Sequence, residues 1–258
     1  MSTAPVFEGS DGHFVATQFA RGPWDPNALH GGAPAALLVR AFEQLPAAEG
    51  LRLARVTYEF IRPALVGPLV VHAEIARPGR RVQLLEASII GGGVEVVRAR
   101  ALQVQAADAA GGTRESTPPP PGPEHGRPPD LRVPHHPMFA FDAIEIVFVA
   151  GNWGGGPSTA WFRLRSPIVA GETPSPLQRL AAAGDFGNGI SATLSWDHYL
   201  YINPDLTLYI EREPTGEWIC LESETRIARE GIGVAESVLY DERGRVGRAT
   251  QALLVAPR

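Results

Sequence analysis

Hydrophobic and polar positions alternate along most of this chain, and two stretches replace the alternation with the spacing of a helix. In the first half, Leu37, Ala41 and Leu45 recur at four-residue intervals, the spacing of one helical face. This pattern predicts a helix over Pro34–Gln44. Four β-rich segments separated by prolines and glycine turns follow it. We predict these strands at Arg55–Arg62, Leu69–Ala76, Val82–Ile90 and Val94–Gln105.

The second half shows the same order of elements. A helix is predicted over Ser175–Ala183, with turns at Pro214–Gly216 and Asp241–Gly244 among the segments that follow it. We predict strands at Leu206–Glu211, Trp218–Ile227, Gly233–Tyr240 and Gly247–Val255.

The two halves also correspond at an offset of 151 residues at both ends of their strand regions, and the register drifts by a few residues at the turns between. Tyr209 lies 151 positions after Tyr58, and Ala252–Val255 lies 151 positions after the similar Ala101–Val104. A fixed offset of this kind is typical of a repeat. We therefore predict one helix-and-strand unit that was duplicated and fused; the alternative is two unrelated α+β domains that share only generic hairpins.

A proline-rich stretch separates the halves. Residues 111–130 hold seven prolines among small and polar residues, and such a stretch favours extended structure without regular ladder bonds. We predict an N-terminal domain at 1–110, a linker at 111–130 and a C-terminal domain at 131–258. Since an antiparallel sheet needs one face covered, the fold class is α+β, with a sheet wrapped on a helix in each half.

All 23 basic residues of the chain are arginine, because the sequence contains no lysine. This excludes a Schiff-base lysine and a lysine on a phosphate-binding loop. A phosphate must then be met by arginine or by backbone amides. The net charge of −5 argues against a general nucleic-acid binder.

A single cysteine, Cys220, excludes an internal disulfide and favours a cytoplasmic protein. The N-terminus shows neither a basic leader nor an apolar stretch, so we expect no signal peptide. No uncharged run reaches the roughly 18 residues of a membrane span, so no membrane partner is expected.

Particular stretches resemble a known family. The helix is entered through His30-Gly31-Gly32, and residues 203–218 and 247–255 are similar to segments of the double-hotdog acyl-CoA thioesterases, the TesB-like group. The resemblance implies two fused hotdog domains, a pseudo-dimer within one chain, and hydrolysis of an acyl-CoA without a cofactor. It also implies a homo-oligomer of the fused chain by analogy.

In that family an Asp, a Thr or Ser, and a Gln of the second hotdog position the hydrolytic water. The resemblance assigns Asp205 and Gln251 to the first and last of these roles. The middle role falls on Thr225, although a count without gaps from Trp218 gives Arg226. The difference matters because adjacent strand residues point to opposite faces.

The side chains of Asp205 and Gln251 and the backbone of Gly31-Gly32 fit that chemistry, but Asp205 and the glycines can also be explained by a purely structural role. A carboxylate at Asp205 can accept a proton, and the amide of Gln251 offers both a donor and an acceptor to one water. Asp205 is also a common turn former after Asn-Pro. Gly31 and Gly32 let a carbonyl approach backbone N–H groups at a helix start, so we expect these amides to polarise a thioester; the alternative is a plain helix entry with a satisfied His30.

Other candidates are weaker. His135-His136 lacks further ligands at metal spacing, so no metal is expected. Gly154–Gly156 and Gly187–Gly189 do not stand in phosphate-loop register, and we predict loops there. Two other functions stay open: a non-hydrolytic acyl-thioester binding protein, and a hydratase, which would need an Asp/His pair at the head of a helix. Asp197-His198 is such a pair in sequence but lies far past the second helix.

Overall fold

We describe the protein from a computed structural model, which covers residues 4–107, 117–130 and 137–258. The first half has a short hairpin, a single 3₁₀ turn at Gln18–Ala20, one α-helix and four long strands. Its elements are β1 (Phe7–Ser10), β2 (His13–Ala16), α1 (Gly32–Glu43), β3 (Leu51–Phe60), β4 (Gly67–Arg77), β5 (Val82–Gly91) and β6 (Val94–Gln105).

The second half repeats this plan with an extra turn of helix and an extra short strand. Its elements are β7 (Ile144–Ala150), β8 (Ser158–Leu164), α2 (Pro176–Gly184), α3 (Gly187–Ile190), β9 (Tyr199–Ile202), β10 (Asp205–Ile210), β11 (Trp218–Ile227), β12 (Ile232–Asp241) and β13 (Gly244–Pro257). Each of the two predicted helices and eight predicted strands is confirmed, with bounds shifted by a few residues.

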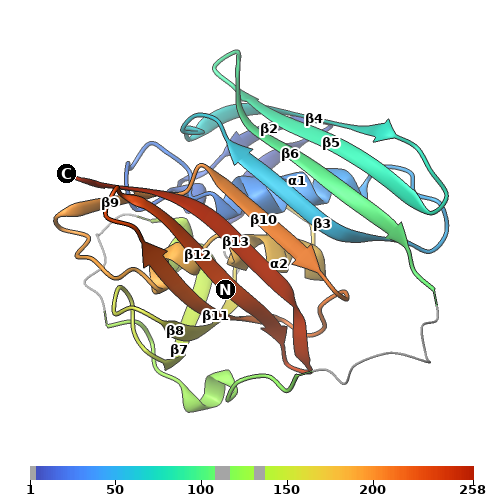
Figure 1. Cartoon of the computed structure of the whole chain (residues 1–258). Helices are drawn as coiled ribbons and strands as arrows, with labels where there is room; N and C mark the ends of the chain where they lie inside the picture. Colours follow the sequence, from blue (N-terminus) through green and yellow to red (C-terminus); the bar gives the residue numbers. More distant parts are fainter. Residues whose placement is uncertain (1–3, 108–116, 131–136) are drawn as a thin grey trace.

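All thirteen strands of the described residues form one antiparallel sheet, in the order β1-β2-β4-β5-β6-β3-β10-β13-β12-β11-β8-β7, with β9 on β13 (Figure 1). The two halves meet where β3 pairs with β10, with Thr57 opposite Thr207. Outward from this seam the strands of each half follow in the same topological order, β3-β6-β5-β4-β2 and β10-β13-β12-β11-β8. The predicted duplication into two fused hotdog domains is therefore confirmed.

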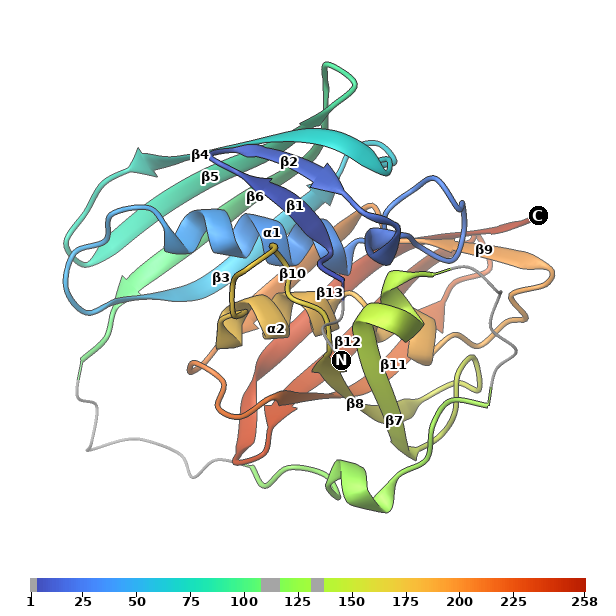
Figure 2. The same cartoon turned by 180° about the vertical axis from the view of Figure 1, so that it is seen from behind.

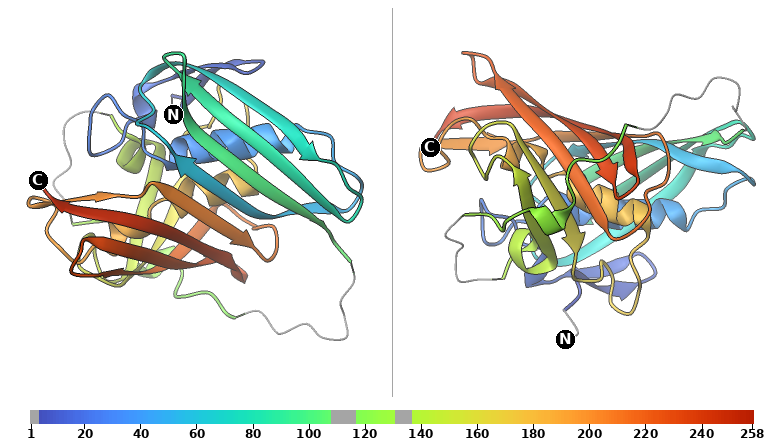
Figure 3. Two further views of the ribbon diagram at one scale, coloured as in Figure 1. Left: turned by 45° about the horizontal axis from the view of Figure 1, so that its top comes forward. Right: turned by 90° about the horizontal axis from the view of Figure 1, so that it is seen from below.

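Both helices lie on the concave side of the sheet, which curves around them (Figure 2, Figure 3). Eleven of the twelve residues of α1 are buried, since the helix packs on β4, β5 and β6 on one side and on α2 on the other. The helices run antiparallel. Arg40 near the end of α1 bonds to Glu172 before α2, and His30 before α1 lies beside Asp185 after α2. The chain before α1 and the chain after α2 therefore meet at one end of the helix pair.

The described part of the expected linker, residues 117–130, packs on the second half. The Trp161 Nε1–H donates to the Pro121 carbonyl oxygen at 2.7 Å, and Arg127 pairs with Phe148 of β7. His135 and His136 lie outside the described residues. Within the described ranges, no helix is long and apolar enough to cross a membrane.

Candidate functional site

A cavity of about 930 Å³ lies between the two halves, at the end where α1 begins and α2 ends. Its walls come from the loop before α1, from the chain after β3, and from residues 138–154 and 185–203 of the second half. Most of the walls are apolar, as is usual for a small-molecule site. The aromatic lining residues are Trp24, Phe60, Phe141, Trp153, Phe186, Trp196 and Tyr201.

The aromatic walls are packed against one another. The rings of Trp24 and Trp196 stack with centroids 4.4 Å apart and planes 5° from parallel. Trp153 lies against Trp196 at 6.1 Å and against Phe186 at 6.5 Å. Aromatic pairs in such arrangements are each worth about 0.5–1.5 kcal/mol beyond the area they bury, so these rings stabilise one another in the wall.

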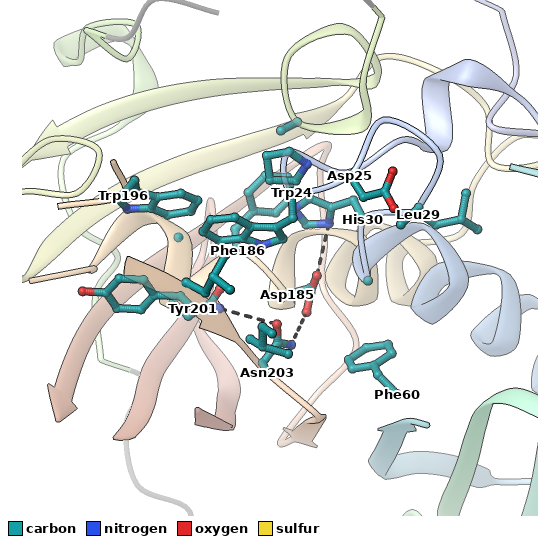
Figure 4. A pocket seen from close by; sticks show the side chains of 18 of the residues that line it. Trp24, Asp25, Leu29, His30, Phe60, Asp185, Phe186, Trp196, Tyr201 and Asn203 are labelled. Carbon is teal, nitrogen blue, oxygen red and sulfur yellow. Dashed lines mark hydrogen bonds and ion pairs between the residues drawn. The ribbon is translucent and has the colours of Figure 1, made fainter. Parts of the chain in front are cut away.

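One buried carboxylate, that of Asp185, reaches this cavity (Figure 4). Its Oδ1 accepts hydrogen bonds from Asn203 Nδ2 at 2.8 Å and from Gln251 Nε2 at 3.2 Å. Its Oδ2 lies 3.1 Å from His30 Nδ1. The side chain is only 5% exposed, and a charge buried this far is stable when it is hydrogen-bonded in this way.

Two glycines allow this approach between the helix ends. A Cβ added at Gly31 would lie 2.7 Å from Asp185 Oδ2, and one at Gly32 would lie 2.5 Å from the Ala182 carbonyl oxygen. Both distances are shorter than any real Cβ contact. The Gly31-Gly32 pair is therefore what lets the start of α1 lie against the end of α2.

Gln251 of β13 lies behind Asp185 rather than in the cavity wall. It is 2% exposed, and its Oε1 accepts from the Asn188 backbone N–H at 3.0 Å. Its Nε2 donates to the side chain and to the backbone carbonyl of Asp185. Both ends of the amide are thus occupied, and the residue fixes the positions of Asp185 and α3.

His30 closes the site from the side of the first half. Its ring lies between Phe186, with centroids 4.4 Å apart, and Phe139, at 5.2 Å. Its Nδ1 faces both Asp185 Oδ2 and the backbone N–H of Gly32, at 3.1 Å each. The Gly32 amide expected for a thioester carbonyl thus points at His30. The Gly31 N–H has no hydrogen-bond partner among the described residues, and Gly31 lines the cavity.

Asp205 is placed away from this group. Its Oδ1 accepts from the backbone N–H of Ala252 at 2.7 Å, and it is not among the cavity-lining residues. Ala252 is exposed while the adjacent Gln251 is buried, so the two side chains leave opposite faces of β13. Burial raises the pKa of the Asp205 carboxyl, and the bond from Ala252 acts against that rise. The structure therefore does not bring Asp205 to the Gln251 amide.

Thr225 faces the interior, and Arg226 faces outward. The Thr225 side chain is buried with its Oγ1 2.7 Å from Ser191 Oγ, whereas Arg226 is exposed and paired with Glu224 and Glu236. The choice between these neighbours is thus settled in favour of Thr225 as the inward residue. Its hydroxyl contacts α3 through Ser191, and it does not line the cavity.

Asp185 and Asn203 were not predicted from the sequence as site residues. A signal existed for Asp185, because it is the one charged residue between the apolar Ala181–Ala183 and Phe186. The loop predicted at Gly187–Gly189 was wrong, since these residues begin α3; the buried Phe186 and Ile190 hold that turn against the sheet. Gly154–Gly156 is a loop, as predicted.

Of the remaining weak candidates, Asp197 lines the cavity as an exposed side chain, and Cys220 does not line it. Cys220 is buried against Trp161 and Tyr240, and burial raises the pKa of its thiol well above the ordinary value. The described residues contain no group of three or more His, Cys, Asp or Glu side chains that could hold a metal ion.

Comparison with known proteins gives consistent matches over both halves. A model of the acyl-CoA thioesterase N-terminal domain matches residues 20–104, and one of the C-terminal domain matches residues 114–255. No curated protein matches the sequence.

Several solved structures share the fold. A hotdog-fold protein of unknown function from Alicyclobacillus acidocaldarius has a TM-score of 0.75 and 16% identity, covering 97% of this chain and 95% of that one. A putative thioesterase II from Thermobifida fusca gives 0.71 and 18%, covering 99% and 95%. The acyl-CoA thioesterase II TesB2 from Mycobacterium marinum gives 0.68 and 16%, covering 98% and 96%.

Proposed function

The chain belongs to the acyl-CoA thioesterase family, and from this premise we propose that it hydrolyses acyl thioesters in the cavity between its two halves. The observation that carries the proposal is the buried Asp185 carboxylate at the cavity wall, held by two amide donors and facing a histidine. Hydrolysis needs a water molecule, a proton acceptor and a donor for the oxyanion, and this end of the cavity offers the last two.

We assign to Asp185 the carboxylate role that the resemblance assigned to Asp205. Asp185 anchors the groups that activate the water, because it alone of the two reaches the cavity. Gln251 keeps a role in the site, but as the residue that positions Asp185. Thr225 stabilises the end of α3 through the hydrogen bond between its hydroxyl and that of Ser191.

The oxyanion donor in this proposal is the backbone N–H of Gly31. It stands at the start of α1, where the helix dipole is positive, and it is free of other partners among the described residues. Gly32 contributes differently from the expectation, since its N–H points at His30 and its missing side chain makes room for Ala182.

The substrate is an acyl thioester with its acyl group among the aromatic walls. A cavity of about 930 Å³ with apolar lining accepts an elongated or ring-bearing acyl group. Arg62 lines the same cavity, and arginine is the cationic side chain that this lysine-free chain offers to a CoA phosphate.

Release of free thiol from a series of acyl-CoA esters, followed with a thiol-reactive dye, tests the proposal. We expect turnover with at least one chain length and saturation at rising substrate concentration. If no ester releases thiol while acyl-CoA binding is measurable by calorimetry, the alternative of a non-hydrolytic acyl-thioester binding protein is correct instead.

A hydratase is the second candidate, and the contact between His30 and Asp185 is the observation that favours it. The two side chains lie 3.1 Å apart at the head of α1, which is the pairing that the sequence did not reveal. Asp197 and His198, the pair adjacent in sequence, are both exposed. Loss of the enoyl absorbance of an enoyl-CoA without thiol release would identify hydration, and unchanged absorbance would exclude it.

A further inference from the structure

Four large apolar side chains lie exposed on the outer face of the sheet, which is the face opposite the helices. They are Ile202 of β9, Ile232 and Val234 of β12, and Leu254 of β13, and they are between 44% and 66% exposed. Each has a buried neighbour in the chain, so the alternation of the strands places all four on the outer face. Figure 1 shows this face, because the strands lie in front of the helices there.

These side chains are direct neighbours across three strands. Leu254 is paired with Ile202 on one side and with Ile232 on the other. In the next row, Val234 is paired with Ala252, which is also exposed. Paired residues of antiparallel strands have Cβ atoms about 4.5–5.5 Å apart, so the five residues form one continuous apolar surface, the outer patch. Single exposed apolar residues are normal on a protein, but a continuous patch is typical of an interaction surface.

The charges on the two sides of the outer patch have opposite signs. On the β11 side, Arg226 is paired in the sheet with Val234. On the β10 side, Asp205 accepts from the Ala252 N–H and is paired in the sheet with Glu59 of β3. Arg226 and Glu59 are both exposed. One row of the sheet therefore carries a positive charge two strands from β13 on one side and a negative charge two strands from β13 on the other.

Arg226 keeps donors for a carboxylate of another molecule. Its Nε and Nη2 donate to Glu224, and its Nη1 donates to Glu236. A guanidinium has five N–H groups, so two of them stay without an acceptor among the described residues. The side chain is exposed on the outer face, where these two groups can bind a carboxylate that approaches the sheet.

A two-fold axis parallel to β13 makes the outer patch complementary to itself. β9 and β10 follow one another along one edge of β13, and β12 lies on the other edge. The axis therefore lays β12 over β9 and β10 of a second copy, and β11 over its β3. Ile232 then faces Ile202 of the second copy, and Arg226 faces Glu59 of the second copy. A patch that matches itself in this way is what a two-fold interface requires, and two sheets packed face to face keep their strands within about 30° of each other.

We propose that the outer patch is the interface of a symmetric dimer, with a second copy of this chain as its occupant. The proposal goes beyond the hydrolysis of thioesters and does not depend on it. Ile202 also lines the cavity, so the second copy lies beside the cavity mouth in this arrangement.

Sedimentation equilibrium of the full chain tests the proposal. We expect the wild type to reach the mass of two chains in the micromolar range. Leu254→Glu places a charge in the centre of the interface and should raise the Kd of the dimer at least about tenfold. Val82→Glu makes the same kind of change at an exposed position on the outer face of β5 in the first half. It is the matched control and should keep the wild-type Kd.

A charge exchange tests the direction of the axis. Glu59→Arg brings two arginines together across the proposed interface, so the Kd should rise. Adding Arg226→Glu to Glu59→Arg restores opposite charges and should bring the Kd back toward the wild-type value. A double variant that dimerises no better than Glu59→Arg alone would overturn this axis.

Three other results would overturn the interface itself. The first is a wild type that stays monomeric through the micromolar range. The second is a Leu254→Glu variant that keeps the wild-type Kd, and the third is a Val82→Glu variant that dissociates as readily as Leu254→Glu. If circular dichroism shows that Leu254→Glu does not fold, the milder Ile232→Ser at the most exposed residue of the patch decides instead. An unchanged Kd in that variant would overturn the interface, and a raised Kd would support it.

Discussion

Replacing Asp185 by asparagine removes one charge and leaves the size of the side chain unchanged. The amide oxygen of the new residue is expected to stay where Oδ1 now accepts from Asn203 and Gln251. Its NH₂ group then faces His30 Nδ1, where a carboxylate oxygen lies in the wild type. The site then lacks the carboxylate that accepts a proton in hydrolysis.

The expected size of the effect follows from these contacts. Loss of a general base lowers kcat about 10²- to 10⁴-fold. At 1.36 kcal/mol for each factor of ten, this raises the barrier by about 2.7–5.4 kcal/mol. KM should change little, because the aromatic walls that bind the acyl group are untouched. Thiol release from the best acyl-CoA ester, measured for both proteins over a range of substrate concentration, gives kcat and KM separately.

The same exchange at Asp205 compares the two assignments. Asp205→Asn keeps an oxygen for the Ala252 N–H and lies outside the cavity wall, so its kcat should stay far closer to the wild type than that of Asp185→Asn. If Asp185→Asn keeps more than a third of wild-type kcat while Asp205→Asn loses most of it, the reasoning from the structure is refuted and the assignment from the sequence is right.

Three further substitutions test how the site and the fold are held. Gln251→Leu leaves the buried Asn188 N–H without an acceptor and Asp185 with one donor fewer. The free energy of unfolding, measured in urea, should therefore fall by about 2–4 kcal/mol, and kcat should fall as well. Unchanged values of both quantities would contradict the positioning role of Gln251. Gly32→Val should lower both stability and turnover because its Cβ would lie 2.5 Å from the Ala182 carbonyl oxygen. Gly189→Ala, whose Cβ makes only ordinary van der Waals contacts, is the milder control for stability. Full turnover of Gly32→Val would count against the close contact between the helices. Asp241 is buried and bonded by Arg212, and although burial acts to raise its pKa, the bonds from Arg212, Thr215 and Arg243 hold it at about 2. A lowered pKa in the folded state stabilises the fold at pH values above the unfolded pKa near 3.8, and this stabilisation is lost as the pH falls from about 4 through 2. The unfolding free energy of the wild type should therefore fall by at most about 2 kcal/mol more over that range than the unfolding free energy of Asp241→Asn. Parallel pH curves of unfolding free energy for the two proteins would refute this.

The sheet and both main helices were predictable because each long strand carries its own alternation. Strands such as Val82–Gly91 alternate buried and partly exposed positions over ten residues, and Leu37, Ala41 and Leu45 mark the helix. The shortest strands were not predicted. β1 and β2 are four residues each, and their pairing is set by contacts with β4 and with Val169 rather than by local pattern.

The site was predictable only where a residue lies within a patterned strand. Gln251 was assigned through the resemblance of residues 247–255 to the family, and its side chain is buried in β13. The resemblance left Thr225 and Arg226 both open, and the burial pattern of β11 shows that Thr225 faces inward. Asp185 becomes a site residue through the antiparallel packing of α1 on α2, which brings His30 from 155 positions away in the chain. No local spacing shows that contact, and the resemblance of residues 203–218 to the family placed the carboxylate role on Asp205 instead.

The central claim, that water attacks an acyl thioester in this cavity, is tested most directly by hydrolysis in H₂¹⁸O. Wild-type protein is incubated with an acyl-CoA ester in H₂¹⁸O, the mass of the acid product is measured by mass spectrometry, and the free thiol is quantified. We expect one ¹⁸O atom in each carboxylate formed, one thiol for each acid, and loss of both products in Asp185→Asn. Acyl-CoA that is bound but yields neither thiol nor labelled acid would contradict it.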